Sequence, residues 1–497
     1  MHRFSACVLV IACAMLASPR RLTAQHDHPA PEKLGSVTFA VSCNSAEQTQ
    51  FNRAVALLHS FAYAEAEKAF REVLTADPTC AMAHWGVAMS YYHQLWEPPL
   101  NDASYAKGSA ELAEDAKAPP RTKRESQYIA ALQLVYSNAD KQSLRERMLA
   151  YERSMAEVSE ANPNDTEAQV FHALALLSTA PATDKTHANQ KKAMAILKPL
   201  YAANPQHPGI AHYMIHACDN AEMAQQGLQA AREYSKIAPS APHALHMPSH
   251  IFTRLGMWNE SVASNEAARR AAHEQGDIGE ELHAMDYLTY AYLQLGRNSE
   301  AAAVVAELQQ MSGLQEHNFK VGYAATAMPV RLAVEREDWE SASRIQPAAN
   351  APGEVTAVAV WAKATGMARL GRTQEAKAEA GKLQALEQDL RKQGKSYWAE
   401  QAAIQSAEAE AWISLAKRDG EAAEKLMRSA ADREESIEKL PLTPGPIVPA
   451  REQLGYLLLE LNQPQRALPE FEASLEQSPW RRNARLVQFQ SSYIPKD

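Results

Sequence analysis

The amino-acid sequence predicts an all-α protein in which helix-turn-helix repeats stack as an α-solenoid. Alanine, leucine, glutamate and glutamine dominate, and glycine is scarce at 19 of 497 residues, a composition that favours helix. The alternation of β-branched residues that marks a strand is nearly absent outside residues 36–42. A spacing of 34 residues relates His212 to His246 and Pro205 to Pro239, which is the period of a helix-turn-helix repeat.

The first 24 residues have the pattern of a secretory signal peptide. Arg3 gives a positive start, and the apolar run over residues 4–17 is too short to span a bilayer. Leu22-Thr-Ala24 precedes a fitting cleavage point, and no later apolar stretch is long enough to cross a membrane. We therefore expect an exported bacterial protein, periplasmic or secreted, with a signal peptide over residues 1–24 and a flexible leader over residues 25–48.

The charge of the chain bears on its partners. Removing the first 24 residues, which carry Arg3, Arg20 and Arg21 and no acid, takes the formal net charge from −9 to −12. An acidic chain without a basic run is a poor candidate for binding nucleic acid or an anionic membrane. The expected partner is a peptide, a protein or a small ligand.

Helical hairpins recur along the rest of the chain. Ala66, Phe70 and Pro78 provide a small residue where helices cross, an aromatic residue that packs between them and a helix stop. Ala467 and Phe471 repeat this pattern near the carboxyl end. The expected segments are N-terminal repeats over residues 49–205 with an insertion near 97–125, histidine-rich repeats over 206–345, further helical repeats over 346–440, an extended proline-rich joint over 441–449, a C-terminal repeat over 450–480 and a tail over 481–497.

These motifs resemble the tetratricopeptide-repeat (TPR) superfamily, and the resemblance covers most of the chain after residue 48. The histidine-bearing centre also resembles large exported bacterial TPR proteins of unestablished activity. The resemblance implies a right-handed superhelix of stacked helix pairs. It also implies that the first helix of each pair lines a concave groove in which ligands bind.

Three cysteines remain after residue 24, and none forms a Cys-x-x-Cys motif. An oxidising compartment permits a Cys43–Cys80 bridge, which would tie the leader to the first repeat. Cys218 is then unpaired, and we expect it to be a small buried residue on a packing face.

Histidines concentrate in the centre, where eight of the 17 lie between residues 207 and 283. When successive first helices are aligned by the Leu-Gly pairs that end them and by the prolines that close each repeat, polar residues occupy matching positions on three helices. His243 and His283 are expected at the mouth of the groove. The complete set of candidate groove residues is His212, His216, His243, His246, His250, His283, Asp286, Tyr290 and Arg331.

The spacing of these histidines suits a metal ion. Histidines four residues apart leave the same face of a helix, so one helix can give two nitrogens to one ion. Imidazole with an added carboxylate suits zinc, copper or iron. The candidate ligands are His212, His216, His246, His250 and Asp286. The alternative is a network of neutral histidines satisfied by internal hydrogen bonds.

Two prolines and an arginine belong to the same region. Pro248 lies inside the second histidine helix, where it predicts a kink or a late helix start. Met328-Pro329 falls at the corresponding place two repeats later. Arg331, at the end of this row, has the chemistry to meet a carboxylate or phosphate on a ligand.

Two functional hypotheses follow. The first is an exported TPR scaffold whose groove binds a peptide, protein or small ligand through the histidine face, either with a bound transition metal (zinc, copper or iron) as cofactor or without one. The second is a metal-dependent enzyme, a hydrolase or an oxidase, that uses the same histidines with Asp286 as ligand or base and Tyr290 as acid. The sequence holds no Gly-rich phosphate loop, no Gly-x-Ser-x-Gly and no His-Glu-x-x-His motif, so it names no reaction.

Overall fold

The computed structural model describes residues 32–114, 118–348 and 350–491, and the expected signal peptide lies outside them. Within these residues the regular structure is helical, and no β-strand occurs. The first half contains the short 3-10 turn η1 (Ser45–Glu47) and helices α1 (Gln48–His59), α2 (Tyr63–Ala76), α3 (Ala81–Met89), α4 (Asp102–Ala113), α5 (Lys123–Gln133), α6 (Leu144–Ala161), α7 (Thr166–Ser178), α8 (Ala188–Ala203), α9 (Pro208–Ala217), α10 (Ala224–Ile237), α11 (Pro242–His246) and α12 (Pro248–Arg254). The second half contains α13 (Trp258–Gln275), α14 (Ile278–Gln294), α15 (Asn298–Gln310), α16 (Phe319–Glu335), α17 (Trp339–Arg344), α18 (Gly353–Arg369), α19 (Thr373–Lys392), α20 (Ser396–Ala416), α21 (Gly420–Glu435), α22 (Ala450–Glu460), α23 (Pro464–Gln477) and α24 (Arg482–Ser491).

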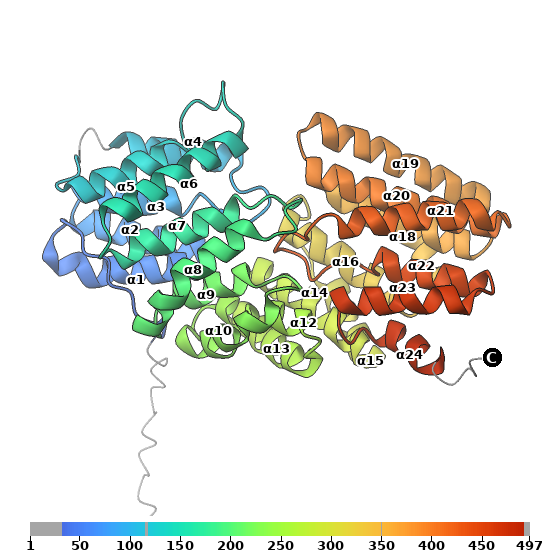
Figure 1. Ribbon diagram of the computed structural model, residues 1–497. Helices are drawn as coiled ribbons and strands as arrows, with labels where there is room; N and C mark the ends of the chain where they lie inside the picture. The colour runs from blue at the N-terminus through green and yellow to red at the C-terminus, as the bar shows by residue number, and fades with distance from the viewer. Residues whose placement is uncertain (1–31, 115–117, 349, 492–497) are drawn as a thin grey trace, which may run out of the picture. The chain divides into compact units, whose positions relative to one another are not determined.

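Consecutive helices pack side by side as hairpins, which Figure 1 shows clearly for α18 to α21. Helices that are separated by one other helix in the sequence also contact each other: α14 contacts α16, α16 contacts α18, and α18 contacts α20. This is the contact pattern of stacked hairpins, in which each repeat packs on its neighbours. The predicted all-α, TPR-like architecture is confirmed. None of the described helices is both long enough and apolar enough to span a bilayer.

A glycine-on-aromatic contact recurs at both ends of the repeat array. Gly86 of α3 lies against the ring of Phe70 in α2, and an added Cβ would come within 2.4 Å of that ring. Gly455 of α22 lies against Phe471 of α23 in the same way, at 2.7 Å. The aromatic residues predicted to pack between helices therefore do so, and glycine is the residue that lets the partner helix approach.

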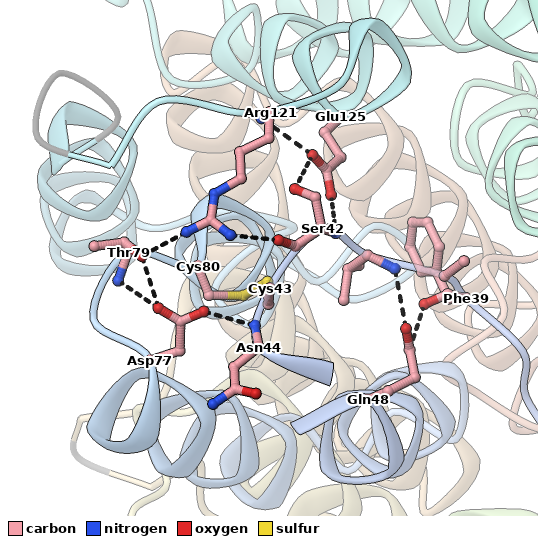
Figure 2. Close-up of a disulfide and its surroundings, with 12 residues drawn as sticks. Phe39, Ser42, Cys43, Asn44, Gln48, Asp77, Thr79, Cys80, Arg121 and Glu125 are labelled. Carbon is pink, nitrogen blue, oxygen red and sulfur yellow. Dashed lines mark hydrogen bonds between the residues drawn. A yellow bond between two sulfur atoms is a disulfide. The ribbon is translucent and has the colours of Figure 1, made fainter. Parts of the chain in front are cut away.

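Residues 33–48, which were predicted to form the end of a flexible leader, pack onto the first repeat. Phe39 is buried against the rings of Phe51 and Trp85, and the backbone of this segment runs without a strand partner. Cys43 and Cys80 form the predicted disulfide (Figure 2).

Charged side chains also hold residues 42–44, next to the disulfide, by hydrogen bonds (Figure 2). Glu125 of α5 accepts hydrogen bonds from the backbone nitrogen and the hydroxyl of Ser42, both at 2.6 Å. Arg121 donates to the backbone oxygen of Ser42 at 2.7 Å and to the hydroxyl of Thr79 at 2.8 Å. Asp77 accepts from the backbone nitrogen of Asn44 at 2.8 Å. The disulfide is thus one of several ties between this segment and the first repeats.

The second histidine helix is broken where its proline predicts. It divides into α11, which ends at His246, and α12, which begins at Pro248, with Met247 between them. Proline is tolerated at the first position of a helix because its missing N–H has no intrahelical partner there. By contrast, Pro329 lies inside the continuous helix α16.

The proline-rich segment 441–449 was predicted to be extended. It folds into turns and bends instead. Long-range contacts hold this segment and Lys439, two residues before it. Arg331 of α16 donates to the backbone oxygens of Gly445 and Pro446, both at 3.0 Å. Lys439 donates to Asp219 at 2.6 Å, across 220 residues of sequence. The segment therefore lies against the middle of the chain, where the histidines are.

Candidate metal centre

Six histidines from three successive repeats lie together. His212 and His216 come from α9, His243, His246 and His250 from α11 and α12, and His283 from α14. Ring centroids lie 5.0 Å apart for His212 and His243, 4.3 Å for His246 and His283, and 5.8 Å for His216 and His250. His243 and His283, expected at a mouth, are only 3% and 5% exposed. The sequence register therefore brings these side chains together, but in the interior.

The six side chains divide into two triads. Triad 1 is His212, His216 and His243, and triad 2 is His246, His250 and His283. Within each triad, one ring nitrogen per residue lies within 4.8 Å of the others. Each triad combines two histidines four residues apart with a third from elsewhere in the chain.

Hydrogen bonds fix the tautomers of His212 and His246. Nδ1 of His212 lies 2.6 Å from the backbone oxygen of His59, which can only accept, so this nitrogen carries the proton. Nδ1 of His246 lies 2.7 Å from Oδ1 of Asn265, whose amide nitrogen donates to the backbone oxygen of Ser261 at 2.7 Å. That second bond sets the orientation of the amide, so His246 is also protonated on Nδ1. In their neutral forms, both rings present a lone pair at Nε2.

Two carboxylates fix His243 and His250 in the same way. Nδ1 of His243 donates to Glu280 at 3.1 Å, and Nδ1 of His250 donates to Asp219 at 2.9 Å. Burial favours the neutral acid, but the ammonium of Lys439 and the other nearby cations hold the pKa of Asp219 well below its usual range. Asp219 is therefore an ionised acceptor, and His250 too has its lone pair at Nε2.

The free lone pairs point at one another. In triad 2, Nε2 of His246 lies 3.1 Å from Nε2 of His250, and neither nitrogen carries a proton in the neutral tautomers just assigned. Two nitrogen lone pairs at this distance repel one another unless a cation lies between them. In triad 1, Nε2 of His212 lies 3.0 Å from Nε2 of His216, which can donate to it because no acceptor holds the proton on Nδ1 of His216. Nε2 of the buried His243 has no hydrogen-bond partner.

Burial makes a bare proton a poor candidate for that cation. Loss of solvent lowers the pKa of His212, His216, His246 and His283 well below the usual value for histidine, and their mutual repulsion lowers it further. Tetrahedral zinc holds two imidazole nitrogens about 3.3 Å apart, given bonds of about 2.0–2.1 Å. The observed separations are close to that value, so the arrangement fits a metal ion bound at Nε2.

The residues that orient the ligands were not identified from the sequence. Metal-bound histidines usually donate their second nitrogen to a carboxylate, a carbonyl or an amide, which fixes the ring. Asp219, Glu280, Asn265 and the carbonyl of His59 fill these roles here. They come from a loop, from α13, from α14 three residues before His283 and from the end of α1, so no single spacing relates all four to the histidines.

Asp286, Tyr290 and Arg331 do not join either triad. The carboxylate of Asp286 pairs with Nε of Arg331 at 3.2 Å, and both side chains are buried. The hydroxyl of Tyr290 accepts from Arg481 at 2.9 Å, and Arg481 also pairs with Glu335 at 2.8 Å. Burial raises the pKa of Asp286, and Arg331 opposes this shift. These residues form a separate buried ionic cluster.

A second polar cluster beside the triads serves as a comparison. Glu167 accepts from Nε2 of His59 at 2.7 Å and from Nε2 of His207 at 2.8 Å. Nδ1 of His59 lies 2.9 Å from the hydroxyl of Tyr213, and Nδ1 of His207 accepts from the backbone nitrogen of Ile210 at 3.3 Å. Every ring nitrogen here has a partner of the right kind. This cluster is a satisfied hydrogen-bond network, whereas the two triads are not.

The insertion after α3 reaches the triads. Trp96 places its indole against both, with ring centroids 5.7 Å from His243 and 5.8 Å from His283. Trp96 also lines a cavity of about 570 Å³, together with His216 and Asp219. Cys218, as predicted, is buried and unpaired, and it contacts the sulfur of Met194 at 3.7 Å.

No protein-family model and no curated protein sequence matches the chain. Solved structures resemble it over most of its length at low identity. Yeast Tom70 is 9% identical with a TM-score of 0.34, covering 89% of this chain and 87% of that chain. The APC/C hetero-tetramer Cut9-Hcn1 is 12% identical with a TM-score of 0.38, covering 89% and 76%. Human IFIT1, solved as a dimer with m7Gppp-AAAA, is 16% identical with a TM-score of 0.35, covering 88% and 95%. Because these identities and TM-scores are low, the fold of this chain is assigned from the packing of its own helix pairs.

Proposed function

We propose that this protein is an exported helical-repeat protein that binds transition metal ions through its two histidine triads. One observation carries the proposal: Nε2 of His246 and Nε2 of His250 face each other at 3.1 Å while both Nδ1 atoms are occupied by acceptors. A cation between the two nitrogens removes the conflict. The neighbouring network around Glu167, which has no such conflict, needs no ion.

The donor set indicates which metals fit. Six imidazoles without a thiolate suit zinc, copper or iron(II), and a site of three ligands leaves a position open for another molecule. A bound ion would polarise such a molecule or lower the pKa of a bound water. The protein's own part is to hold the rings through Asp219, Glu280 and Asn265 and to exclude bulk water by burial.

Export is supported by the disulfide. Bridges such as Cys43–Cys80 persist in oxidising compartments and are rare in the cytosol. The signal-like pattern of residues 1–24 agrees with a periplasmic or secreted protein. The exported chain would acquire its metal in the same compartment.

Metal analysis of protein purified without an affinity tag tests the proposal. We expect about one to two equivalents of a transition metal, retained through gel filtration or regained on dialysis. Replacing His246 and His250 together by glutamine should remove the ion from triad 2 with the helical content unchanged. His172, which meets only Glu152 at 3.6 Å, is the control, and His172→Gln should leave the metal content as it is. Less than about a tenth of an equivalent, with none regained, would end the proposal.

The second candidate is a metal-dependent enzyme, a hydrolase or an oxidase, on the same site. The observation that favours it is the cavity of about 570 Å³ lined by His216 and Asp219, which gives a substrate a place beside triad 1. Turnover that rises with metal occupancy and disappears when His212 and His216 of triad 1 are replaced by glutamine would support it. A protein that binds metal stoichiometrically but shows no such turnover would remain a metal-binding scaffold.

A further inference from the structure

The cavity beside triad 1 has polar groups that the fold leaves without partners. Its volume of about 570 Å³ is within the range of small-molecule sites. Gln94 and Gln190 line it, their Oε1 atoms are buried and accept no hydrogen bond, and Gln94 as a whole is only 3% exposed. Nδ1 of His216 lines the same cavity and is also buried without a partner. Buried polar atoms of this kind carry a free-energy cost unless another molecule satisfies them.

The remaining wall is aromatic and apolar, apart from the indole nitrogens of Trp96 and Trp398, which are also buried without a hydrogen-bond partner. The indoles of Trp96 and Trp398 line the cavity, together with the side chains of Met148, Leu177 and Leu442. Aromatic walls favour a flat ring, which stacks or packs edge-on against an indole. The body of the ligand is therefore expected to be an aromatic ring.

Most of the charged groups on the wall are already paired, and burial raises the pKa of Glu97, which also lines the cavity, so the neutral form of its carboxyl is favoured. Asp219 meets Lys439 at 2.6 Å, and Lys395 meets Glu354 at 2.6 Å. A charged ligand would have to displace one of these pairs inside a partly apolar cavity, which is costly. The ligand that fits is neutral.

A hydroxyl is the polar group that matches these acceptors. It donates to Oε1 of Gln94 or Gln190, and it can either donate to or accept from Nδ1 of His216. That versatility matters because Nδ1 of His216 is an acceptor when Nε2 carries the proton and a donor when Nε2 binds a metal. An ether lacks the donor hydrogen, so it leaves the two amide oxygens without a partner.

We propose that this cavity binds neutral phenol-like compounds, with the ring between the indoles and the hydroxyl on the amide oxygen of Gln94. The site does not require the metal proposed above, because Gln94 and the indoles belong to neither triad. Its position against His216 and Trp96 places the bound ring beside the histidine cluster.

Phenol and anisole are the probes, since they share the ring and differ in the donor hydrogen. Each is titrated into the metal-free and the metal-loaded protein, with binding followed by ligand-observed saturation-transfer NMR. We expect phenol to bind about tenfold more tightly than anisole, the equivalent of one hydrogen bond. Gln94→Leu should weaken phenol about tenfold and leave anisole unchanged. Gln50→Leu, at a residue outside the cavity that bonds to Glu72, is the matched control.

Ala180→Trp gives an independent test, because Ala180 lines the cavity and the larger side chain would fill it. This variant should lose both probes while its circular dichroism stays native. Equal affinities for phenol and anisole, or unchanged phenol binding in Gln94→Leu or Ala180→Trp, would overturn the proposal. If Gln94→Leu does not fold, the comparison of phenol with anisole on the unaltered protein still tests whether the cavity requires a donor hydrogen. Because metal content is measured separately, a failure here is distinct from a failure of the metal proposal.

Discussion

Removing the Cys43–Cys80 bridge tests how the segment before α1 is held. The two cysteines are 37 residues apart in sequence. The loss of chain entropy that such a loop imposes on the unfolded state corresponds to about 4 kcal/mol at 25 °C. We therefore expect the double variant Cys43→Ala, Cys80→Ala to lower the free energy of local unfolding of residues 36–59 by about that amount.

Hydrogen exchange followed by mass spectrometry is the suitable assay, because a repeat array of this length need not unfold in one step. A change of about 4 kcal/mol corresponds to exchange that is about a thousandfold faster in peptides from this segment. The helices after α13 should exchange as before. The unaltered protein treated with a reductant is the matched control and should reproduce the double variant.

A change below about 1 kcal/mol would refute this reasoning. It would mean that the hydrogen bonds of Ser42 to Glu125 and of Asn44 to Asp77 hold the segment without help from the bridge.

Two further predictions concern single side chains. Asn265→Leu removes the acceptor for Nδ1 of His246 while keeping the shape of the side chain. Metal affinity, measured by competition titration, should therefore fall about 10- to 100-fold. An unchanged affinity would mean that Asn265 does not orient His246 for metal binding. Burial raises the pKa of Glu434 from 4.5 to about 7, so the folded protein binds a proton there more tightly than the unfolded chain does. This contribution to stability is complete below pH 4.5 and is lost as pH rises through 7. The gain in stability of Glu434→Gln over the unaltered protein should therefore be about 2–3 kcal/mol larger at pH 8 than at pH 5, measured by urea unfolding.

Matched controls separate these effects from general perturbation. Ser264, the neighbour of Asn265, donates to the backbone oxygens of Leu245 and His246 in α11 and contacts no ring nitrogen, so Ser264→Ala should leave metal affinity within twofold, about 0.4 kcal/mol. Glu472 is exposed, and Glu472→Gln should show no pH-dependent gain. A gain for Glu434→Gln that is the same at both pH values would contradict the assigned proton.

The sequence predicted the features that depend on periodicity. The 34-residue spacing of the histidine pairs placed His212 and His246 on neighbouring helices, and their rings both lie in the buried cluster. The Phe70 and Phe471 contacts follow from the same repeat. Such features depend on register along the chain, and register can be read from one sequence.

Features that depend on contacts between unrelated positions were missed. Asp219 reaches His250 from the loop after α9, and no periodicity links the two. Asp286 shares the register of the histidines, but Arg331 from α16 takes its carboxylate because a buried guanidinium needs an opposite charge. A burial-driven ion pair of this kind is invisible until the neighbouring helix is in place.

The contacts of Lys439 with Asp219, Arg331 with Gly445 and Arg481 with Tyr290 have a consequence for how the array behaves as a whole. In a simple solenoid, deletion of repeats from one end shortens the stack and leaves the rest folded, because each repeat contacts only its neighbours. Here, a protease cut after residue 435 would withdraw cations and carbonyl groups from the centre of the chain. Loss of the carboxyl-terminal segment would therefore disturb the surroundings of the histidines directly, even while the repeats between them stay folded.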